Sequence, residues 1–141
     1  MANQDLVDQM LDRESIRNVH VLYCHYIATK NHNAFLDLFT DDARYVFEGE
    51  APLTGTFVGR AEISTVFMQA AEHDFWPLAA GHAIFLAGPT NASGTAYSQV
   101  WDGKTDPRAI SISIYNDKYV KVAAAQWRIS ERIYNAIKIN S

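Results

Sequence analysis

The side chains best suited to chemistry are concentrated between Val21 and Gly49. This stretch holds more polar and aromatic groups than the buried face of a helix needs: Tyr23, His25, Tyr26, His32 and Tyr45. A neutral imidazole can take up a proton near neutral pH, and a tyrosine hydroxyl can donate a hydrogen bond without carrying a full charge. The aromatic content of 12% is enough to line a pocket as well as to fill a core.

Several other kinds of site have no support in the sequence. The five histidines form no i, i+4 pair and no H-E-x-x-H motif, and the lone Cys24 adds no ligand set, so we expect no metal. A glycine-rich phosphate loop and a G-x-S-x-G elbow are absent, which argues against nucleotide binding and serine hydrolysis. Cys24 has no partner that would activate it, because His25 points elsewhere on a helix. We therefore expect no cofactor.

Composition places the chain among ordinary globular proteins. Its 141 residues suit one domain, and 48% hydrophobic with 20% charged residues are typical values. A net charge of −4 with scattered basic residues predicts no binding to nucleic acid or to an anionic membrane. A single cysteine, acids at Asp5 and Asp8 in place of an apolar leader, and no apolar run of roughly 18 residues predict a cytoplasmic location.

The first part of the chain predicts three helices. Asn3 is a candidate N-cap for a helix over about 4–30, and Asn31-His32-Asn33 favours a break after it. A short helix follows over 34–39, and a third opens at Gly59 and ends by His73 or Asp74, because Pro77 cannot continue it. The first helix is amphipathic, with apolar positions mostly at helical spacing: Leu6, Met10, Val19, Leu22, Tyr23, Tyr26 and Ile27.

The remaining segments alternate as strands do. We expect these at about 44–48, 56–58, 80–86, 95–101, 109–122 and 126–137. In the strand over 109–122, isoleucines lie on one face, and Ser111, Ser113, Tyr115 and Asp117 lie on the other. In the last strand, the pattern sets Trp127, Ile129 and Ile133 against Arg128, Ser130, Arg132 and Tyr134. Helices followed by antiparallel strands predict a single α+β domain over residues 1–141.

Several motifs, in order, resemble the SnoaL-like branch of the NTF2-like superfamily. They are Tyr23-Cys24, the segment Leu38–Ala43 (LFTDDA), Phe57–Ile63 (FVGRAEI), Gly81-His82, and the hairpin of 115–121 and 126–129. The last of these is similar to the hairpin of the bile-acid 7α-dehydratase type, with scytalone dehydratase and polyketide cyclases as further relatives. The resemblance implies an NTF2-like cone, in which a curved antiparallel sheet wraps around a long N-terminal helix, with two further helices.

The resemblance also implies a site. Enzymes of this family that eliminate water or HX, or that isomerise, use a histidine held by a carboxylate as the general base, with tyrosines that polarise a carbonyl or hydroxyl group. Here His82 falls at the base and Tyr23 at a pocket tyrosine, whereas Ala28 and Asn31 stand where relatives commonly carry acids. Asn31 can hydrogen-bond an imidazole but cannot neutralise an imidazolium. The residues expected to bind substrate are Tyr26, Tyr45, Phe57, Tyr97, Trp101, Tyr115 and Asp117.

Substitutes for the missing acids remain open at this point. Asp117 would serve if its strand face points inward, and Asp102 lies near a strand where relatives also have an acid. His25 or His32 could replace His82 as the base. Asp102 precedes a glycine, however, so its alternative role is a turn residue.

Two functional hypotheses follow. The first is a cofactor-free lyase or isomerase, of the dehydratase or cyclase kind, that acts on a small hydrophobic, cyclic substrate in the cone, with His82, Tyr23 and Asn31 as catalytic residues. The alternative is a binding protein for a small hydrophobic molecule that kept the cone and lost the acidic partner. In both cases the isoleucine-bearing outer face of the sheet predicts a homodimer.

Overall fold

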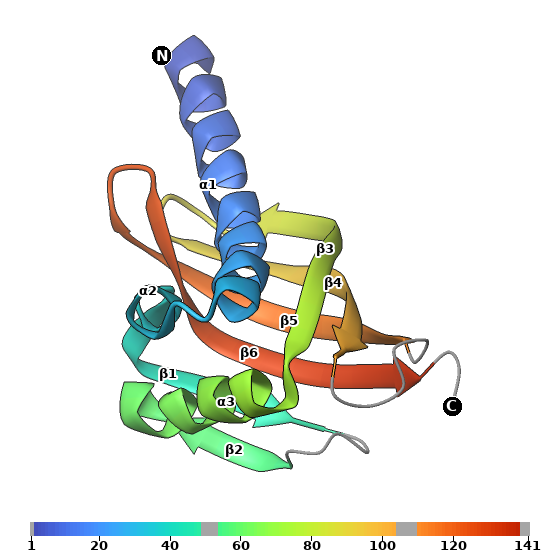
Figure 1. The fold of residues 1–141 in the computed structure, drawn as a ribbon. Coiled ribbons are helices and arrows are strands. Elements are labelled where there is room, and N and C mark those ends of the chain that lie inside the picture. The colour runs from blue at the N-terminus through green and yellow to red at the C-terminus, as the bar shows by residue number, and fades with distance from the viewer. Residues whose placement is uncertain (1, 49–53, 104–109, 139–141) are drawn as a thin grey trace.

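The computed structural model describes residues 2–48, 54–103 and 110–138. Within them the long helix α1 (Ala2–Thr29) is followed by the short α2 (His32–Leu36), by β1 (Phe39–Phe47) and β2 (Gly55–Val58), and by α3 (Gly59–His73). The chain then forms β3 (Phe75–Leu86), β4 (Asn91–Asp102), β5 (Ile110–Ala123) and β6 (Gln126–Lys138). Figure 1 shows these elements along the chain.

The strands form one curved sheet in the order β2-β1-β6-β5-β4-β3. Every neighbouring pair is antiparallel except β1 and β6, which run parallel. The sheet is therefore mixed, which corrects the expectation of a purely antiparallel one, while the α+β cone itself is confirmed. The two partners β1 and β6 belong to opposite ends of the chain, so their pairing has no hairpin to impose an antiparallel direction.

Helices α1 and α3 cover the same, concave face of the sheet (Figure 1). Helix α1 packs on β3 and β6, and α3 packs on β1. The core between the two layers is built from one face of each helix and from the inward strand positions, including Ile16, Val19, Tyr23, Ile27, Ile63, Phe67, Phe35, Phe39 and Tyr45. No helix among the described residues is long and apolar enough to cross a membrane.

The first turns of α1 project beyond the sheet (Figure 1). Leu6 and Met10 are therefore 58% and 70% exposed, although their spacing had predicted burial. Asn3 lies inside the helix, which begins at Ala2, so it is not the N-cap. Asn31 takes that role one helix later, where its side-chain oxygen accepts from the backbone N–H of Ala34 and begins α2.

The strands are longer than their patterns predicted. β1 begins at Phe39, inside the segment expected to be helical, and β3 begins at Phe75 rather than at residue 80. Helix α3 ends at His73, as expected, with Asp74 in a left-handed conformation at φ 60°. Pro77 lies within β3, where a residue without an N–H is tolerated because β3 is an edge strand.

Two one-residue bulges decide which side chains point into the cone. In β6, Ser130 is an extra residue between Ile129, which pairs with Tyr119, and Glu131, which pairs with Lys118. A bulge reverses the alternation beyond it, so Arg132 points inward and Ile133 outward, opposite to the expected faces. In β3, the register shifts between Ala79 and Gly81 in the same way. His82 consequently shares the inner face with Ala96, its partner on β4.

Candidate functional site

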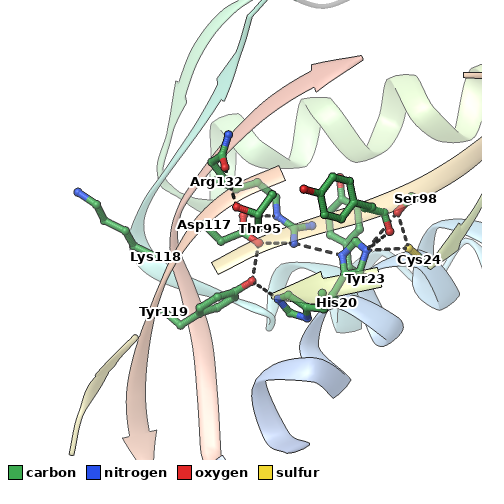
Figure 2. A network of polar contacts seen from close by, with 12 residues as sticks. His20, Tyr23, Cys24, Thr95, Ser98, Asp117, Lys118, Tyr119 and Arg132 are labelled. Atoms are coloured by element: carbon green, nitrogen blue, oxygen red, sulfur yellow. Dashed lines mark hydrogen bonds and ion pairs between the residues drawn. The ribbon is translucent and has the colours of Figure 1, made fainter. Parts of the chain in front are cut away.

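A buried ion pair lies at the centre of the sheet's inner face. Asp117 on β5 and Arg132 on β6 are cross-strand partners, and the side chains of both are fully buried. The guanidinium donates through Nε to Asp117 Oδ1 and through Nη2 to Oδ2, each at 2.8 Å. Its Cζ also lies 4.4 Å and 4.2 Å from the ring centres of Tyr23 and Tyr115. Arg132 is thus held by a bidentate salt bridge (Figure 2) and lies against the rings of Tyr23 and Tyr115, whose planes are inclined at 69° to each other.

Tyr119 links this ion pair to His82. Its hydroxyl donates to Asp117 Oδ2 at 2.5 Å and lies 2.8 Å from His82 Nε2. Because the single hydroxyl proton is donated to the carboxylate, Tyr119 must accept from Nε2–H of the neutral imidazole. Burial, and next the charge of Asp117, raise the pKa of Tyr119 above its ordinary value, so the hydroxyl keeps that proton.

This chain of hydrogen bonds, the His82–Tyr119–Asp117 relay, fixes His82 as a neutral imidazole with its lone pair on Nδ1. Burial lowers the pKa of His82 to about 4; Arg132 and Arg17 act in the same direction, and Asp117 opposes them. Nδ1 is itself buried and has no hydrogen-bond partner within residues 2–48, 54–103 and 110–138. The site therefore presents an unprotonated, unpaired nitrogen, backed through Tyr119 by a carboxylate.

His20 holds the other side of Arg132. Nη2 of Arg132 donates to His20 Nδ1 at 3.2 Å, so the neutral ring carries its proton on Nε2. Nε2 lies 3.1 Å from both the carbonyl oxygen of Tyr97 and Ser98 Oγ. Burial and next the charge of Arg132 lower the pKa of His20 to about 3. Because both ring nitrogens are engaged and the ring is only 2% exposed, His20 is not placed to exchange protons with a ligand.

Tyrosine hydroxyls lie near the Asp117–Arg132 ion pair. Tyr23 and Tyr45 share a hydrogen bond of 2.5 Å between their hydroxyl oxygens, and Ser113 Oγ lies 3.1 Å from the hydroxyl of Tyr134. Burial raises the pKa of Tyr23 to about 12 and that of Tyr45 well above its usual value. The hydroxyls thus stay protonated at neutral pH and can act as uncharged donors.

The structure brings five of the predicted residues together. Tyr23, Tyr45, Tyr115 and Asp117 are all buried around Arg132 or directly beside it, and His82 joins them through Tyr119. Asp117 is therefore an interior carboxylate and not a charge at the rim. Tyr26 and Phe57 are half-buried and pack against the same core.

Other predicted residues lie elsewhere. Asn31 caps α2 and makes no hydrogen bond to His82, which corrects the expected pairing of the two. Tyr97 and Trp101 alternate with the buried Ala96 and Ser98, so their side chains occupy the outer face of the sheet. Among the alternatives, Asp102 pairs with His73 at 3.6 Å, His32 lies 2.6 Å from Ser64 Oγ, and His25 is exposed.

Three residues of the site were missed by the sequence analysis, and each left a weak signal. His20 precedes Tyr23 by one helical turn, which puts both on one face of α1. Tyr119 follows Asp117 by two residues on a strand, which also puts them on one face. Arg132 lies on the inner face of the sheet only because the bulge at Ser130 reverses the alternation of β6, and no sequence signal marks that bulge.

The chain belongs to the SnoaL-like family of the NTF2-like superfamily: the SnoaL-like domain model matches residues 8–133. No curated protein matches its sequence. Among solved structures it is similar to a hexachlorocyclohexane dehydrochlorinase from Novosphingobium barchaimii, with 13% identity, a TM-score of 0.78, and coverage of 96% of this chain and 94% of that one.

Two further structures share the fold. A proposed scytalone dehydratase from Novosphingobium aromaticivorans has 19% identity and a TM-score of 0.77, with 97% of this chain and 89% of that one covered. A protein of unknown function from Mycobacterium tuberculosis has 22% identity and a TM-score of 0.75, with coverage of 94% and 75%. At these identities the likeness establishes the cone and leaves the chemistry to the residues of this chain.

Proposed function

We propose that the protein is a cofactor-free lyase or isomerase that removes a proton from carbon in a small, hydrophobic, cyclic substrate. The observation that carries this proposal is the unpaired Nδ1 of His82, the free end of the His82–Tyr119–Asp117 relay. The activities that two structural neighbours' names give them, dehydrochlorination and scytalone dehydration, are eliminations and suit such a base.

In the proposed step, His82 Nδ1 forms a bond to the proton as the substrate's C–H bond breaks. The electron pair left on carbon moves toward an adjacent carbonyl to form an enolate, or expels a leaving group from the next carbon. The positive charge that develops on His82 is stabilised by Asp117 through the hydroxyl of Tyr119. Return of the proton to a different carbon of the enolate completes an isomerisation. In an elimination, the leaving group departs with the electron pair, and the proton passes from His82 to the leaving group or to solvent.

This relay takes the place of the direct histidine–carboxylate pair that relatives use. Ala28 is too short and apolar to orient His82, and Asn31 is engaged at the start of α2. Asp117 is farther from the imidazole than a directly bonded carboxylate would be, and the positive charge of Arg132 offsets part of its negative charge. It therefore stabilises the imidazolium less strongly than a direct partner would. We therefore expect a weak base suited to acidic C–H bonds, such as those next to a carbonyl.

Hydrogen exchange in D2O tests the proposal without knowledge of the natural substrate. A panel of cyclic ketones, from cyclohexanone to 1-tetralone, is incubated with the protein, and loss of the α-proton NMR signal is followed. Exchange above the buffer rate for at least one ketone is expected. Saturable binding of these ketones with exchange at the buffer rate would contradict the lyase proposal and favour the alternative, a non-catalytic binding protein.

We also propose that the protein is a homodimer that associates through the outer face of the sheet. Alternation along β3, β4 and β6 places large apolar side chains there, of which Leu78, Phe85 and Ile137 are 53%, 62% and 53% exposed. A hollow of about 290 Å³ on this face could receive side chains of the second copy; its lining includes Phe85, Thr95, Lys118 and Ile133. Patches of this kind mark interaction surfaces.

Replacing Leu78 with Asp should shift the dimer to monomer, because it places a charge in the apolar centre of the interface. Sedimentation velocity across a concentration series measures the shift. Met68→Asp is the matched control, since Met68 is equally exposed, at 57%, but lies on α3 away from this face. A wild-type protein that sediments as a monomer at every concentration would refute the dimer.

A further inference from the structure

Arg17 stands opposite His82 where α1 packs on β3. Two contacts fix this register: Arg13 donates through Nη1 to the carbonyl oxygen of Ile84 at 2.8 Å, and the rings of His20 and His82 lie 5.7 Å apart. From Arg13 to Arg17 the helix advances about 6 Å, and from Ile84 back to His82 the strand covers about 7 Å. Spacings of four and three residues put the three helix side chains on one side of α1, so Arg17 faces His82.

The β3 side of this seam covers His82 only thinly. We call the α1–β3 seam the contact between Arg13 and Arg17 on the helix and residues 79–84 on the strand. Most of these strand residues are small and exposed: Ala79, Ala80, Gly81 and Ala83. Because such side chains cannot cover a neighbouring ring, His82 is only half-buried although it points inward.

The guanidinium of Arg17 has a partner that a ligand can replace. Its Nη1 pairs with Glu14 at 3.1 Å, one helical turn away, and the two side chains are 51% and 73% exposed. Exposed ion pairs of this kind contribute little free energy, so an anionic group of a ligand can displace the glutamate. Arg13 is tied to β3 by its bond to Ile84. The seam therefore offers one exchangeable guanidinium, whose two-pronged edge matches a single carboxylate.

The charge of Arg17 also acts on the imidazole. Burial is the main cause of the lowered pKa of His82; Asp117 opposes it, and Arg132 and Arg17 lower the pKa further. Arg132 acts from inside the cone, whereas Arg17 acts from the seam. An anion bound to Arg17 would thus lie close to the ring that takes the proton in the proposed reaction.

We infer that Arg17 binds a carboxylate of the substrate and so holds the substrate at the α1–β3 seam beside His82. This inference deepens the proposed function and rests on it for the identity of the base. It makes the substrate an anion with an apolar ring. The ring enters among the aromatic side chains, and the carboxylate stays at the exposed seam, where it avoids the cost of burying a charge.

A matched pair of probes tests the subsite: 4-oxocyclohexanecarboxylate and 4-oxocyclohexanecarboxamide, which have nearly the same shape and differ in charge. By NMR titration, the wild-type protein should bind the acid at least about fivefold more tightly, the upper range for an exposed ion pair. In Arg17→Gln the preference should disappear. In Glu14→Gln it should increase, because the competing carboxylate is gone.

Arg44→Gln is the matched control. Arg44 is 52% exposed and also pairs with a glutamate, Glu131 at 3.1 Å, but it lies on β1, separated from β3 by β6, β5 and β4. This variant should keep the preference of the wild type. Without any ligand, Arg17→Gln should raise the pKa of His82 above about 4, and Arg44→Gln should leave it unchanged.

The outcomes separate this inference from the proposed function. A preference for the acid that depends on Arg17, with no exchange of α-protons, would support the carboxylate subsite and refute the lyase. Equal binding of acid and amide by the wild type, or an equal preference in the wild type and Arg17→Gln, would overturn the inference even where exchange occurs. So would an acid that fails to bind up to its solubility limit, or a pKa of His82 that Arg17→Gln leaves unchanged.

Discussion

Replacing Asp117 with Asn should destabilise the protein by about 3–5 kcal/mol, because the change leaves the charge of Arg132 buried without a partner. The side chains of both residues are fully buried, and the two bonds between them are 2.8 Å long. Such a loss is a large part of the stability of an ordinary domain. Urea unfolding followed by circular dichroism measures it as a lower midpoint at unchanged slope.

Asp41→Asn is the matched control. Asp41 also pairs with an arginine, Arg60 at 3.3 Å, but its side chain is 91% exposed, so the same substitution should cost less than about 1 kcal/mol. The double variant Asp117→Leu, Arg132→Met should regain much of the stability, because it removes both charges together. Equal losses for Asp117→Asn and Asp41→Asn would show that the buried pair does not hold the sheet's inner face together.

Replacing His82 with Gln should slow α-proton exchange by about 10²–10⁴-fold, the usual contribution of a positioned general base. Glutamine can keep a hydrogen bond to Tyr119, but its amide cannot accept a proton from carbon. The rate is measured by NMR in D2O with the ketone that exchanges fastest in the wild-type protein. Circular dichroism should show an unchanged fold, since His82 is only half-buried.

His25→Gln serves as the histidine control, because His25 is exposed on α1 and is not part of the His82–Tyr119–Asp117 relay. It should leave the exchange rate within about twofold of the wild type, as surface substitutions generally do little. Tyr119→Phe should lie between the two, since it removes the link to Asp117 but leaves Nδ1 in place. If His82→Gln exchanges as fast as His25→Gln, the base must be sought elsewhere.

The fold could be predicted because its signals are local and numerous. The long helix, the short helices and the alternating strands each follow from spacing, and their order with the family motifs defined the cone. The errors in the fold have local causes too. The exposed Leu6 and Met10 follow a helical pattern that continues past the edge of the sheet, where nothing covers it.

The site could be predicted only in part, because two bulges set its geometry. Without the extra residue in β3, His82 would point outward, and without Ser130 in β6, Arg132 would do so. Strand alternation predicts a face only while the register is unbroken, and a one-residue insertion reverses it. Tyr23, Tyr115 and Asp117 were placed correctly because their strands or helix have no such break before them.

The most direct test of the relay is the protonation state of His82, read by two-bond 1H–15N NMR of histidine-labelled protein against pH. We predict a neutral ring with the proton on Nε2 at pH 7, and a pKa of about 4, because burial disfavours the charged form. Since the base acts when unprotonated, exchange should hold steady above about pH 5 and fall as the pH drops through 4. A proton on Nδ1 at pH 7, or a pKa above the ordinary 6.5, would contradict the account.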